Sequence, residues 1–427
     1  MTTAAFLLLR HASENREEWL SRFYEIGKEA VRPRRKGELQ GFEIVNSGAN
    51  GPLLRHILHR GGVTTIYGER LNGSKNKGAP LHTYVPITQP YGDFAKALLE
   101  AQHYPDLRDS AGHPIVPYDV TAQSLSLLMG LEVLPVYGPL RYKKVLIEEE
   151  SELPYYGKES RVAIYKSHVP SMDEGWTRWA LQQNGRTSPW TNMDEVVNHR
   201  IPFSTLLDSE VRAGKLNDKY ESIVISDESP KDILNGYKAG TMPPEYTGGL
   251  GQAGVKALRE FVEQGGTLVC LNRASSFAIE QFKLPVRDVV ASLSEKEFFV
   301  PGSILRIELD ASHPLTQGMP KETIAWVEDS PVFEVIRDRG SSPTVREGSG
   351  GEMSASNVHI IARYPADRNP LLSGWLLGAD RIKGKAALVE VTMGKGRVIL
   401  FGFRPQYRGQ SLATYPLFFN AISSKQN

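Results

Sequence analysis

Cysteine is nearly absent from this chain of 427 residues, which contains a single one, Cys270. One cysteine excludes a disulfide framework within the chain and any zinc site built from several cysteines. An excess of charge of one sign is also missing, because the formal net charge is +1 at pH 7. Without a basic field, nothing in the composition favours nucleic acid as a partner, and we expect none.

Long apolar runs are missing as well. No stretch approaches the ~18 residues of a membrane span, and the six-residue run AAFLLL lacks the basic n-region and the length of a signal peptide. We therefore expect neither a span nor a signal peptide in this chain, and the localisation stays open. The composition, 40% hydrophobic and 23% charged, is typical of a globular protein, and the length predicts two or three domains.

The order of the predicted elements divides the chain into four parts. Residues 1–40 are expected to form an N-terminal helix, which extends from Thr2 to Arg32 and ends in a basic run with a proline. Residues 41–139 read as a small α/β domain, and residues 140–160 as a linker. Residues 161–427 form the larger domain.

Strands and helices alternate in the first half of the larger domain. Strands are predicted at Arg161–Tyr165, Ser222–Ser226 and Thr267–Leu271, and helices at Asp173–Asn184 and Gln252–Glu263. This alternation predicts an α/β fold with a parallel, doubly wound, flavodoxin-like sheet. The second half is rich in strands, which predicts an antiparallel extension of that sheet.

Three loops that follow these strands are the candidate ligand-binding surface, since open α/β sheets bind ligands at the carboxyl ends of their strands. Two arginines and several carboxylates in one pocket suit a polar ligand such as a peptide, a carbohydrate or an amino acid. The alternative is that these residues only cap helices and pair with one another. The candidates are Ser171, Asp173, Glu174 and Arg178 in the first loop, Asp227, Ser229, Asn235, Glu245 and Tyr246 in the second, and Arg273 and Ser275 in the third.

Histidines at helical spacing are the candidate metal ligands. His11 and Glu14 form an H-x-x-E pair, but a working zinc site needs a third ligand, an open coordination position and a base. His56 and His59 share a helix face without a carboxylate at ligand spacing. We interpret both pairs as ordinary surface or half-buried residues and predict no metal and no cofactor.

Cys270 lies at the end of a predicted strand and before a helix, in G-G-T-L-V-C-L-N. This string resembles the region in which class I glutamine amidotransferases carry their nucleophile. A nucleophilic cysteine requires a histidine and an orienting carboxylate. No glycine flanks Cys270 directly, and neither His313 nor His359 has a carboxylate two residues on. We predict a buried core thiol and no catalytic residue; a hydrolase or amidotransferase acting through Cys270 is the alternative.

Longer strings carry a wider family resemblance. SMDEGWTRWAL, GTMPPEYTGGLG and GKGRVILFGFRPQYR resemble the C-terminal region of large bacterial zinc carboxypeptidase-like proteins. QPYGDFAKALLEAQHYPDL and PYDVTAQSLSLLMG resemble the segment just upstream in the same proteins. The resemblance extends from about Ala12 onward. In that family a secreted or periplasmic, carboxypeptidase A-like catalytic domain comes first, and the last region is amidotransferase-like.

The resemblance implies a function without implying a catalytic residue. The family's zinc site, an H-P-x-E pair with a later histidine and a glutamate base, is expected to fall before this chain, and His11–Glu14 lacks its proline. The resemblance therefore implies a non-catalytic accessory module that binds substrate or packs on a carboxypeptidase-type catalytic domain, in cis or in trans. Metallocarboxypeptidase activity and a stand-alone peptide- or carbohydrate-binding protein are the alternatives.

Overall fold

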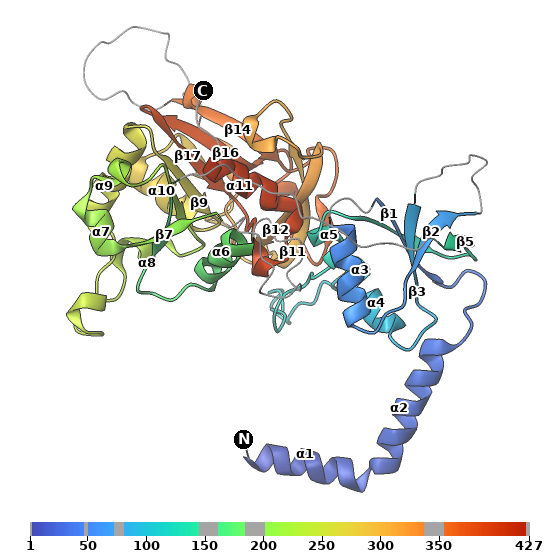
Figure 1. Cartoon of the computed structure of the whole chain (residues 1–427). Helices are drawn as coiled ribbons and strands as arrows, with labels where there is room; N and C mark the ends of the chain where they lie inside the picture. The colour runs from blue at the N-terminus through green and yellow to red at the C-terminus, as the bar shows by residue number, and fades with distance from the viewer. Residues whose placement is uncertain are drawn as a thin grey trace. The chain divides into compact units, whose positions relative to one another are not determined.

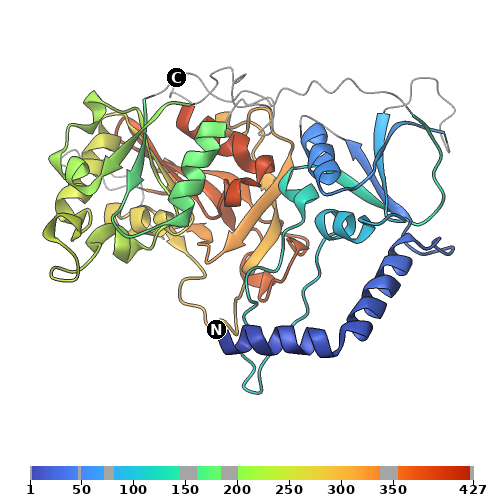
Figure 2. The same cartoon turned by 60° about the horizontal axis from the view of Figure 1, so that its bottom comes forward.

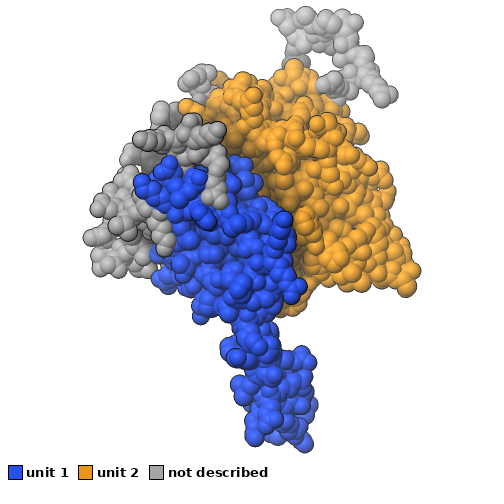
Figure 3. Space-filling model, turned by 90° about the vertical axis from the view of Figure 1, so that its right-hand side faces the viewer, with its two compact units in different colours: residues 1–100, 131–151 blue, residues 101–130, 152–427 orange. Residues whose placement is uncertain are grey.

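The structure is a computed structural model of the whole chain, and it describes residues 2–46, 50–71, 81–144, 161–183, 201–336 and 354–423. The chain forms two compact units. Unit 1 comprises Met1–Glu100 and Leu131–Ser151, and unit 2 comprises Ala101–Gly130 and Glu152–Asn427 (Figure 3). Among the described residues, no helix is both long and apolar enough to cross a lipid bilayer.

Unit 1 is built on a small antiparallel sheet of five strands in the order β4-β1-β3-β2-β5. Its apolar core includes Phe42, Ile44 and Val85 from the strands. The strands are β1 (Gly41–Asn46), β2 (Ile66–Arg70), β3 (Leu81–Pro86), β4 (Glu132–Val136) and β5 (Tyr142–Lys144), and the helices α3 (Gly51–Arg60) and α4 (Gly92–Leu99) contribute further buried leucines. The small α/β domain is thus present, and β5 lies in the predicted linker.

The N-terminal segment forms two helices, α1 (Thr2–Glu14) and α2 (Arg16–Val31), and not the single helix that was predicted. Asn15 interrupts them with a non-helical backbone (φ −113, ψ 26). Its side-chain amide donates to the carbonyl of His11 at 2.9 Å, and such local bonds compete with regular helix geometry. Both helices extend away from the sheet of unit 1 (Figure 1).

Unit 2 contains a large mixed sheet whose centre is parallel. Five strands lie in the order β7-β6-β8-β9-β17 and pair parallel throughout. Numbered along the chain, their order is 2-1-3-4-5, which is the flavodoxin-like arrangement. These strands are β6 (Val162–Lys166), β7 (Phe203–Leu207), β8 (Ser222–Ile225), β9 (Thr267–Leu271) and β17 (Gly396–Phe401). The prediction of a parallel doubly wound sheet is confirmed.

An antiparallel extension continues the sheet beyond β17, as predicted. The extension runs β16-β14-β11-β12, and every pairing within it is antiparallel. Its strands are β11 (Pro301–Leu309), β12 (Glu322–Glu328), β14 (Val358–Arg363) and β16 (Ala386–Met393), with three short strands beside them, β10 (Val286–Asp288), β13 (Phe333–Val335) and β15 (Leu371–Ser373).

Helices cover both faces of the parallel strands (Figure 2). Alternate residues of β6 point to opposite faces, so that Ile164 packs with one apolar cluster and Ala163 with the other. The first cluster includes residues of α6 (Met172–Gln183) and α11 (Tyr415–Ser423); the second includes residues of α7 (Asp208–Ala213), α8 (Pro230–Asn235), α9 (Gly251–Glu263) and α10 (Ala274–Phe282). Each fully buried large side chain contributes roughly 1.5–3 kcal/mol.

Residues 101–130 belong to unit 2, which corrects the predicted boundary of 41–139. Thr121 donates its hydroxyl to the carbonyl of Gly302 at 3.0 Å, and Leu128 packs with Trp326. The backbone of Gln102 accepts a hydrogen bond from Gly374 at 2.7 Å. These bonds fasten the segment to the antiparallel extension. Within this segment Leu125–Leu128 (α5) is helical.

Candidate functional site

The carboxyl ends of the parallel strands bring four loops together, and we call this region the carboxyl edge. Ser167 to Glu174 follow β6, and Ser226 to Ser229 follow β8. Asn272 and Arg273 follow β9, and Arg404 lies shortly after the end of β17. In a sheet of this order the switch point lies between β6 and β8, where ligands bind in open α/β folds.

Asp227 is the centre of the hydrogen bonds at this edge. Its Oδ1 accepts from Arg273 Nε at 2.9 Å and its Oδ2 from Arg404 Nη2 at 2.8 Å. The backbone N–H of Arg273 adds a third bond at 3.1 Å. Burial raises the pKa of Asp227, but the bonds from Arg273 and the charge of Arg404 outweigh it, and the net pKa is lowered. Asp227 is therefore held as a carboxylate.

Arg404 is buried among three carboxylates, with 8% of its side chain exposed. Besides Asp227, it lies 2.9 Å from an oxygen of Glu328 and 3.3 Å from one of Asp173. Its guanidinium lies over the ring of Trp326 at 5.4 Å. Burial raises the pKa of Asp173 to about 6 although Arg404 lowers it. Arg404 thus contacts three carboxylates, and one of them, Asp173, has a pKa near neutral pH.

The strand-to-helix turn after β9 is occupied by an asparagine. Asn272 has φ 52, in the left-handed region that asparagine tolerates better than most residues. Its buried amide donates to Asp227 at 3.1 Å and to the carbonyl of Glu328 at 3.2 Å. A nucleophile elbow would place its reactive side chain at such a turn. Here the turn carries a carboxamide that links neighbouring loops.

Cys270 lies two residues earlier, inside β9. It is fully buried in the apolar cluster beneath α9 and α10. Burial raises the pKa of its thiol far above the ordinary value, which is the opposite of what a nucleophilic cysteine requires. The interpretation of Cys270 as a core thiol is confirmed. His313 and His359 contact each other and pair with Glu390 and Asp310.

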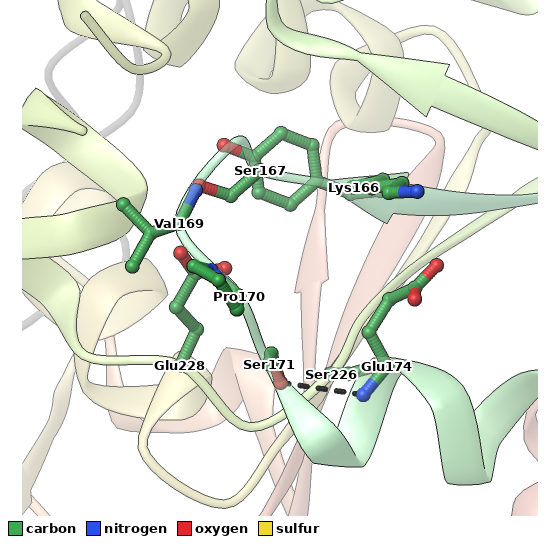
Figure 4. Close-up of a pocket in the computed structure, with 9 residues that line it drawn as sticks. Lys166, Ser167, Val169, Pro170, Ser171, Glu174, Ser226 and Glu228 are labelled. Atoms are coloured by element: carbon green, nitrogen blue, oxygen red, sulfur yellow. Dashed lines mark hydrogen bonds between the residues drawn. The ribbon is translucent and has the colours of Figure 1, made fainter. Parts of the chain in front are cut away.

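A small cavity of about 210 Å³ lies at the switch point. Its walls come from the end of β6, from the loop that leads into α6 and from the end of β8. Figure 4 shows the loop from Ser167 to Ser171 running between the side chains of Glu228 and Glu174 in this view, with Lys166 directed away from Glu228. The lining is polar, with Ser167, Ser171, Glu174, Ser226 and Glu228 among its residues.

Glu228 and Asp208 are buried carboxyls beside this cavity. Glu228 is 8% exposed, and its Oε1 has no hydrogen-bond partner among the described residues. Asp208 accepts a hydrogen bond from Tyr165 at 2.6 Å, while its Oδ2 has no partner in the same part of the chain. Burial raises the pKa of Glu228 to about 7. The cavity therefore contains hydrogen-bonding capacity that the described residues do not satisfy.

A second cavity of about 410 Å³ lies on the other side of Arg273. Its wall is partly apolar, with Val290, Phe298 and Phe299, and partly acidic, with Asp288 and Glu328. Burial raises the pKa of Asp288, which accepts hydrogen bonds from the backbone of Val290 and Val332. Asp288 is thus bonded to backbone N–H groups, and Glu328 is paired with Arg404.

The structure brings five of the predicted candidates together at the carboxyl edge. Asp173, Asp227 and Arg273 are joined through the ion pairs above. Ser171 donates to the carbonyl of Asp227 at 2.9 Å and accepts from the backbone of Glu174 at 3.3 Å, and both line the small cavity. Whether these residues bind a ligand stays a prediction.

The other candidates lie elsewhere or have structural partners. Arg178 pairs with Glu174 and donates to Thr205 on β7 at 3.0 Å. Ser229 caps α8 by accepting from Asp232 at 3.1 Å, and the ring of Tyr246 packs edge-on against His168 at 5.3 Å. Asn235 and Glu245 lie on the exposed surface and line neither cavity.

Ser275 is a correction to the predicted site. Its side chain is fully buried in the first turn of α10. Its hydroxyl lies 3.0 Å from the carbonyl of Cys270 and 2.9 Å from that of Phe401. The serine therefore ties α10 to two adjacent strands and presents no surface to a ligand. Ser275 was predicted as a site residue because it lies close to Arg273 in the sequence, but its side chain is buried inside the fold and not at the carboxyl edge.

Glu228 and Arg404 were not predicted as site residues from the sequence. Glu228 directly follows Asp227 after the same strand, so the rule that found Asp227 also applies to it. Arg404 follows β17, which belongs to the second, strand-rich half of the larger domain. Recognising that β17 pairs parallel with β9 would have added Arg404 to the candidate set.

The histidine pairs have ordinary partners. His11 contacts the side chain of Asn15 at 3.1 Å, and Glu14 forms an ion pair with Arg10 at 2.8 Å. His59 contacts the hydroxyl of Thr65 at 2.9 Å. In the part of the chain that the structure describes, no group of three or more His, Cys, Asp or Glu side chains is placed to hold a metal ion.

Comparison with known proteins finds likeness only among solved structures. No family model matches the chain, and no curated protein matches it. A ThuA-like protein from Bacteroides uniformis is 12% identical, covering 64% of this chain and 96% of that chain with a TM-score of 0.35. A GMP synthase protein from Thermoplasma acidophilum is 9% identical, covering 62% of this chain and 96% of that chain with a TM-score of 0.33. A β-galactosidase from Bacillus circulans is 15% identical, covering 61% of this chain and 31% of that chain with a TM-score of 0.32.

Proposed function

We propose that this chain is a non-catalytic accessory module that packs on a carboxypeptidase-type catalytic domain, in cis or in trans. The observation that supports it best is the arm, by which we mean α1 and α2. The resemblance of the longer sequence strings to zinc carboxypeptidase-like proteins supplies the class of the partner. The carboxyl edge supplies a second surface, suited to a polar ligand.

The arm carries an apolar surface that the described residues do not cover. α1 has no buried residue, and Ala30 is the one buried residue of α2. Phe23 is 77% exposed and Leu9 is 70% exposed. The other large apolar side chains exposed on the arm are Phe6, Leu7, Leu8, Trp19, Leu20, Tyr24, Ile26 and Val31. A helix that is apolar on several sides is normally buried.

The exposed apolar area of the arm is large. The four aromatic side chains alone present on the order of 500 Å², taking about 200 Å² for each ring. Contiguous apolar patches of more than a few hundred Å² mark interaction sites. Burial of such a surface contributes about 25 cal/mol for each Å² removed from water. The arm therefore has enough apolar surface to anchor a stable interface.

The charges of the arm favour a protein partner over an anionic membrane. Its polar residues form ion pairs within the helices, such as Arg22 with Glu18 at 2.7 Å and Lys28 with Glu25 at 3.3 Å. Helices that lie in a membrane surface carry a polar face rich in lysine and arginine. Here glutamates and basic residues alternate, so attraction to anionic lipid is weak.

The position of Cys270 and Asn272 supports the non-catalytic part of the proposal. The thiol is buried in the sheet, and the strand-to-helix turn carries an amide bonded to Asp227. The residues at the carboxyl edge thus stabilise the loops and line a polar cavity. A stand-alone binding protein is the second candidate, and the cavity at the switch point favours it.

Co-purification tests the proposal. The tagged protein is isolated from its native source, and zinc and release of C-terminal residues from peptides are measured in the eluate. The arm variant L20E/F23E introduces two charges at exposed positions, so its own folding should be unaffected. Y118E is the matched control, because Tyr118 is exposed but lies outside the arm.

We expect zinc and carboxypeptidase activity to accompany the wild type and Y118E, and to be lost from L20E/F23E. Equal activity with the arm variant would contradict docking through the arm. If the wild type carries neither zinc nor activity, the accessory role is wrong and the stand-alone binding protein takes its place.

A further inference from the structure

We propose that the cavity at the carboxyl ends of β6 and β8 binds small polar compounds that carry a primary ammonium group, with Glu228 as the acceptor. The inference deepens the proposed function by naming a ligand class for the carboxyl edge. It does not depend on the arm, so that each can fail without the other.

The first argument is the unused acceptor. Glu228 lines the cavity and is more than nine-tenths buried, yet its Oε1 has no hydrogen-bond partner among the described residues. A buried carboxylate oxygen without a donor has lost its hydration without compensation, which destabilises the folded state. Native structures rarely keep such a group unless a ligand, an ion or a water satisfies it. A donor that enters the cavity is therefore favoured at this atom.

The second argument is the local charge. Burial is the main cause that raises the pKa of Glu228; a side-chain hydrogen bond from Ser167 lowers it, and three carboxylates raise it further, namely those of Asp232, Asp208 and Asp227. Glu174 lines the cavity together with Glu228, and it pairs with Arg178. Lys166 is exposed and directed away from Glu228 (Figure 4). Arg212 donates to the carbonyl of Gly249, and the charges of Arg212 and His168 act on Asp208, where burial outweighs them and the pKa is raised.

These charges select among ligand types. An anion would be repelled by the carboxylate of Glu228, which forms no ion pair with the described residues, and a neutral polyol would leave its charge unbalanced. An ammonium group supplies both the missing donor and the missing positive charge, and hydrogen bonds to charged groups are stronger than neutral ones. The sign of the surroundings therefore points to a cation with several N–H donors.

The third argument is the shape and lining of the cavity. An ammonium group has three donors, and the hydroxyls of Ser167, Ser171 and Ser226 line the same space. Ser226 lies 2.8 Å from the hydroxyl of Thr177, and Ser171 donates to the carbonyl of Asp227 and accepts from the backbone N–H of Glu174, so that each of these two hydroxyls retains acceptor capacity. A volume of about 210 Å³ admits a small compound and no polymer. Amino alcohols, amino sugars and amino acid amides share the required chemistry.

Calorimetric titration with matched pairs tests the inference. Ethanolamine is compared with ethylene glycol, glucosamine with glucose, and glycinamide with glycolamide, because each pair differs in an amine and a hydroxyl. The protein variants are E228Q, which keeps the shape of the side chain, and E245Q as the matched control on the exposed surface. Thermal unfolding of each variant shows whether it is folded.

At pH 8 we expect at least one amine to bind to the wild type and to E245Q. The hydroxyl compound of the same pair should bind at least about tenfold more weakly to both proteins, and the amine should bind to E228Q with a similar loss of affinity. The pair that binds best distinguishes the three sources. If no amine binds, or if amine and alcohol bind alike, the inference is wrong. The same holds if folded E228Q binds the amine as well as the wild type does.

Proton release gives a second readout on the unmodified protein. The pKa of Glu228 is about 7, so the side chain is largely protonated at pH 6 and charged at pH 8.5. Binding of ethanolamine, whose amine stays protonated at both pH values, to the carboxylate must then release protons at pH 6 and few at pH 8.5. Binding without such a difference would place the ligand elsewhere. This measurement decides the question if E228Q does not fold.

Discussion

Replacing Arg404 by methionine should destabilise unit 2 by about 3–5 kcal/mol at pH 8, since removal of one partner of a buried ion pair leaves the other charge uncompensated. Methionine keeps most of the aliphatic length of arginine and removes the guanidinium. The structure places that group within 2.8–3.3 Å of oxygens from Asp227, Glu328 and Asp173, with 8% of the side chain exposed. Water therefore cannot replace it readily.

The loss should depend on pH, and the sign follows from the carboxyls. In the wild type the pKa of Asp227 is lowered and that of Asp173 is about 6. Without the charge of Arg404, which lowers the pKa of both carboxyls, we expect both folded-state pKa values to rise, that of Asp173 further above its unfolded value of 3.8. Such a group favours folding at low pH, and this contribution is lost as the pH rises through the folded-state pKa. The deficit of R404M should therefore be largest at pH 8 and smaller at pH 5.

Urea unfolding at the two pH values measures this deficit, with tryptophan fluorescence reporting mainly on unit 2, which contains five of the six tryptophans. R408M is the matched control: Arg408 pairs with Asp119 at 2.7 Å, but the two side chains are 36% and 44% exposed, and such pairs contribute less than about 1 kcal/mol. A loss below about 1 kcal/mol for R404M at pH 8, or equal losses at pH 5 and pH 8, would refute the reasoning.

Two further predictions concern buried groups of unit 2. As the pH rises from 5 to 8, E228Q should gain up to about 3 kcal/mol of stability relative to the wild type. The folded state raises the pKa of Glu228 from 4.5 to about 7, which stabilises the wild type at low pH, and this contribution is lost as the pH rises through 7. Denaturation curves that stay parallel across this range would count against a buried Glu228. Cys270 should resist iodoacetamide in the native protein at pH 8 and react once urea unfolds it, since the thiol is fully buried; rapid labelling of the native protein would show that the thiol is accessible.

Strongly patterned segments of the fold were predictable from the sequence. Five of the predicted strands and helices of the parallel half, such as Thr267–Leu271 and Gln252–Glu263, reappear within one or two residues as β9 and α9. Their apolar runs or helical spacing are unambiguous. β7 was missed because FSTLL lies at the edge of the sheet and is half exposed, so its pattern is weak. The break at Asn15 was missed because one side-chain bond to His11 decides it.

Only part of the candidate site was predictable from the sequence, because the residues differ in their position relative to the predicted strands. Asp227 and Arg273 follow their strands directly, so the rule for open sheets found them. Arg404 was missed because its strand, β17, also forms a hairpin with β16 and reads as antiparallel. The burial of Glu228 comes from packing among loops and short helices distant in sequence, which no local pattern encodes.

The most direct test of the central claim is to measure zinc and carboxypeptidase turnover in the isolated chain beside the co-purified assembly. The account predicts that the isolated chain has neither and that the assembly has both. Stoichiometric zinc with turnover in the isolated chain would contradict it, and His11 and Glu14 would then be the first residues to replace.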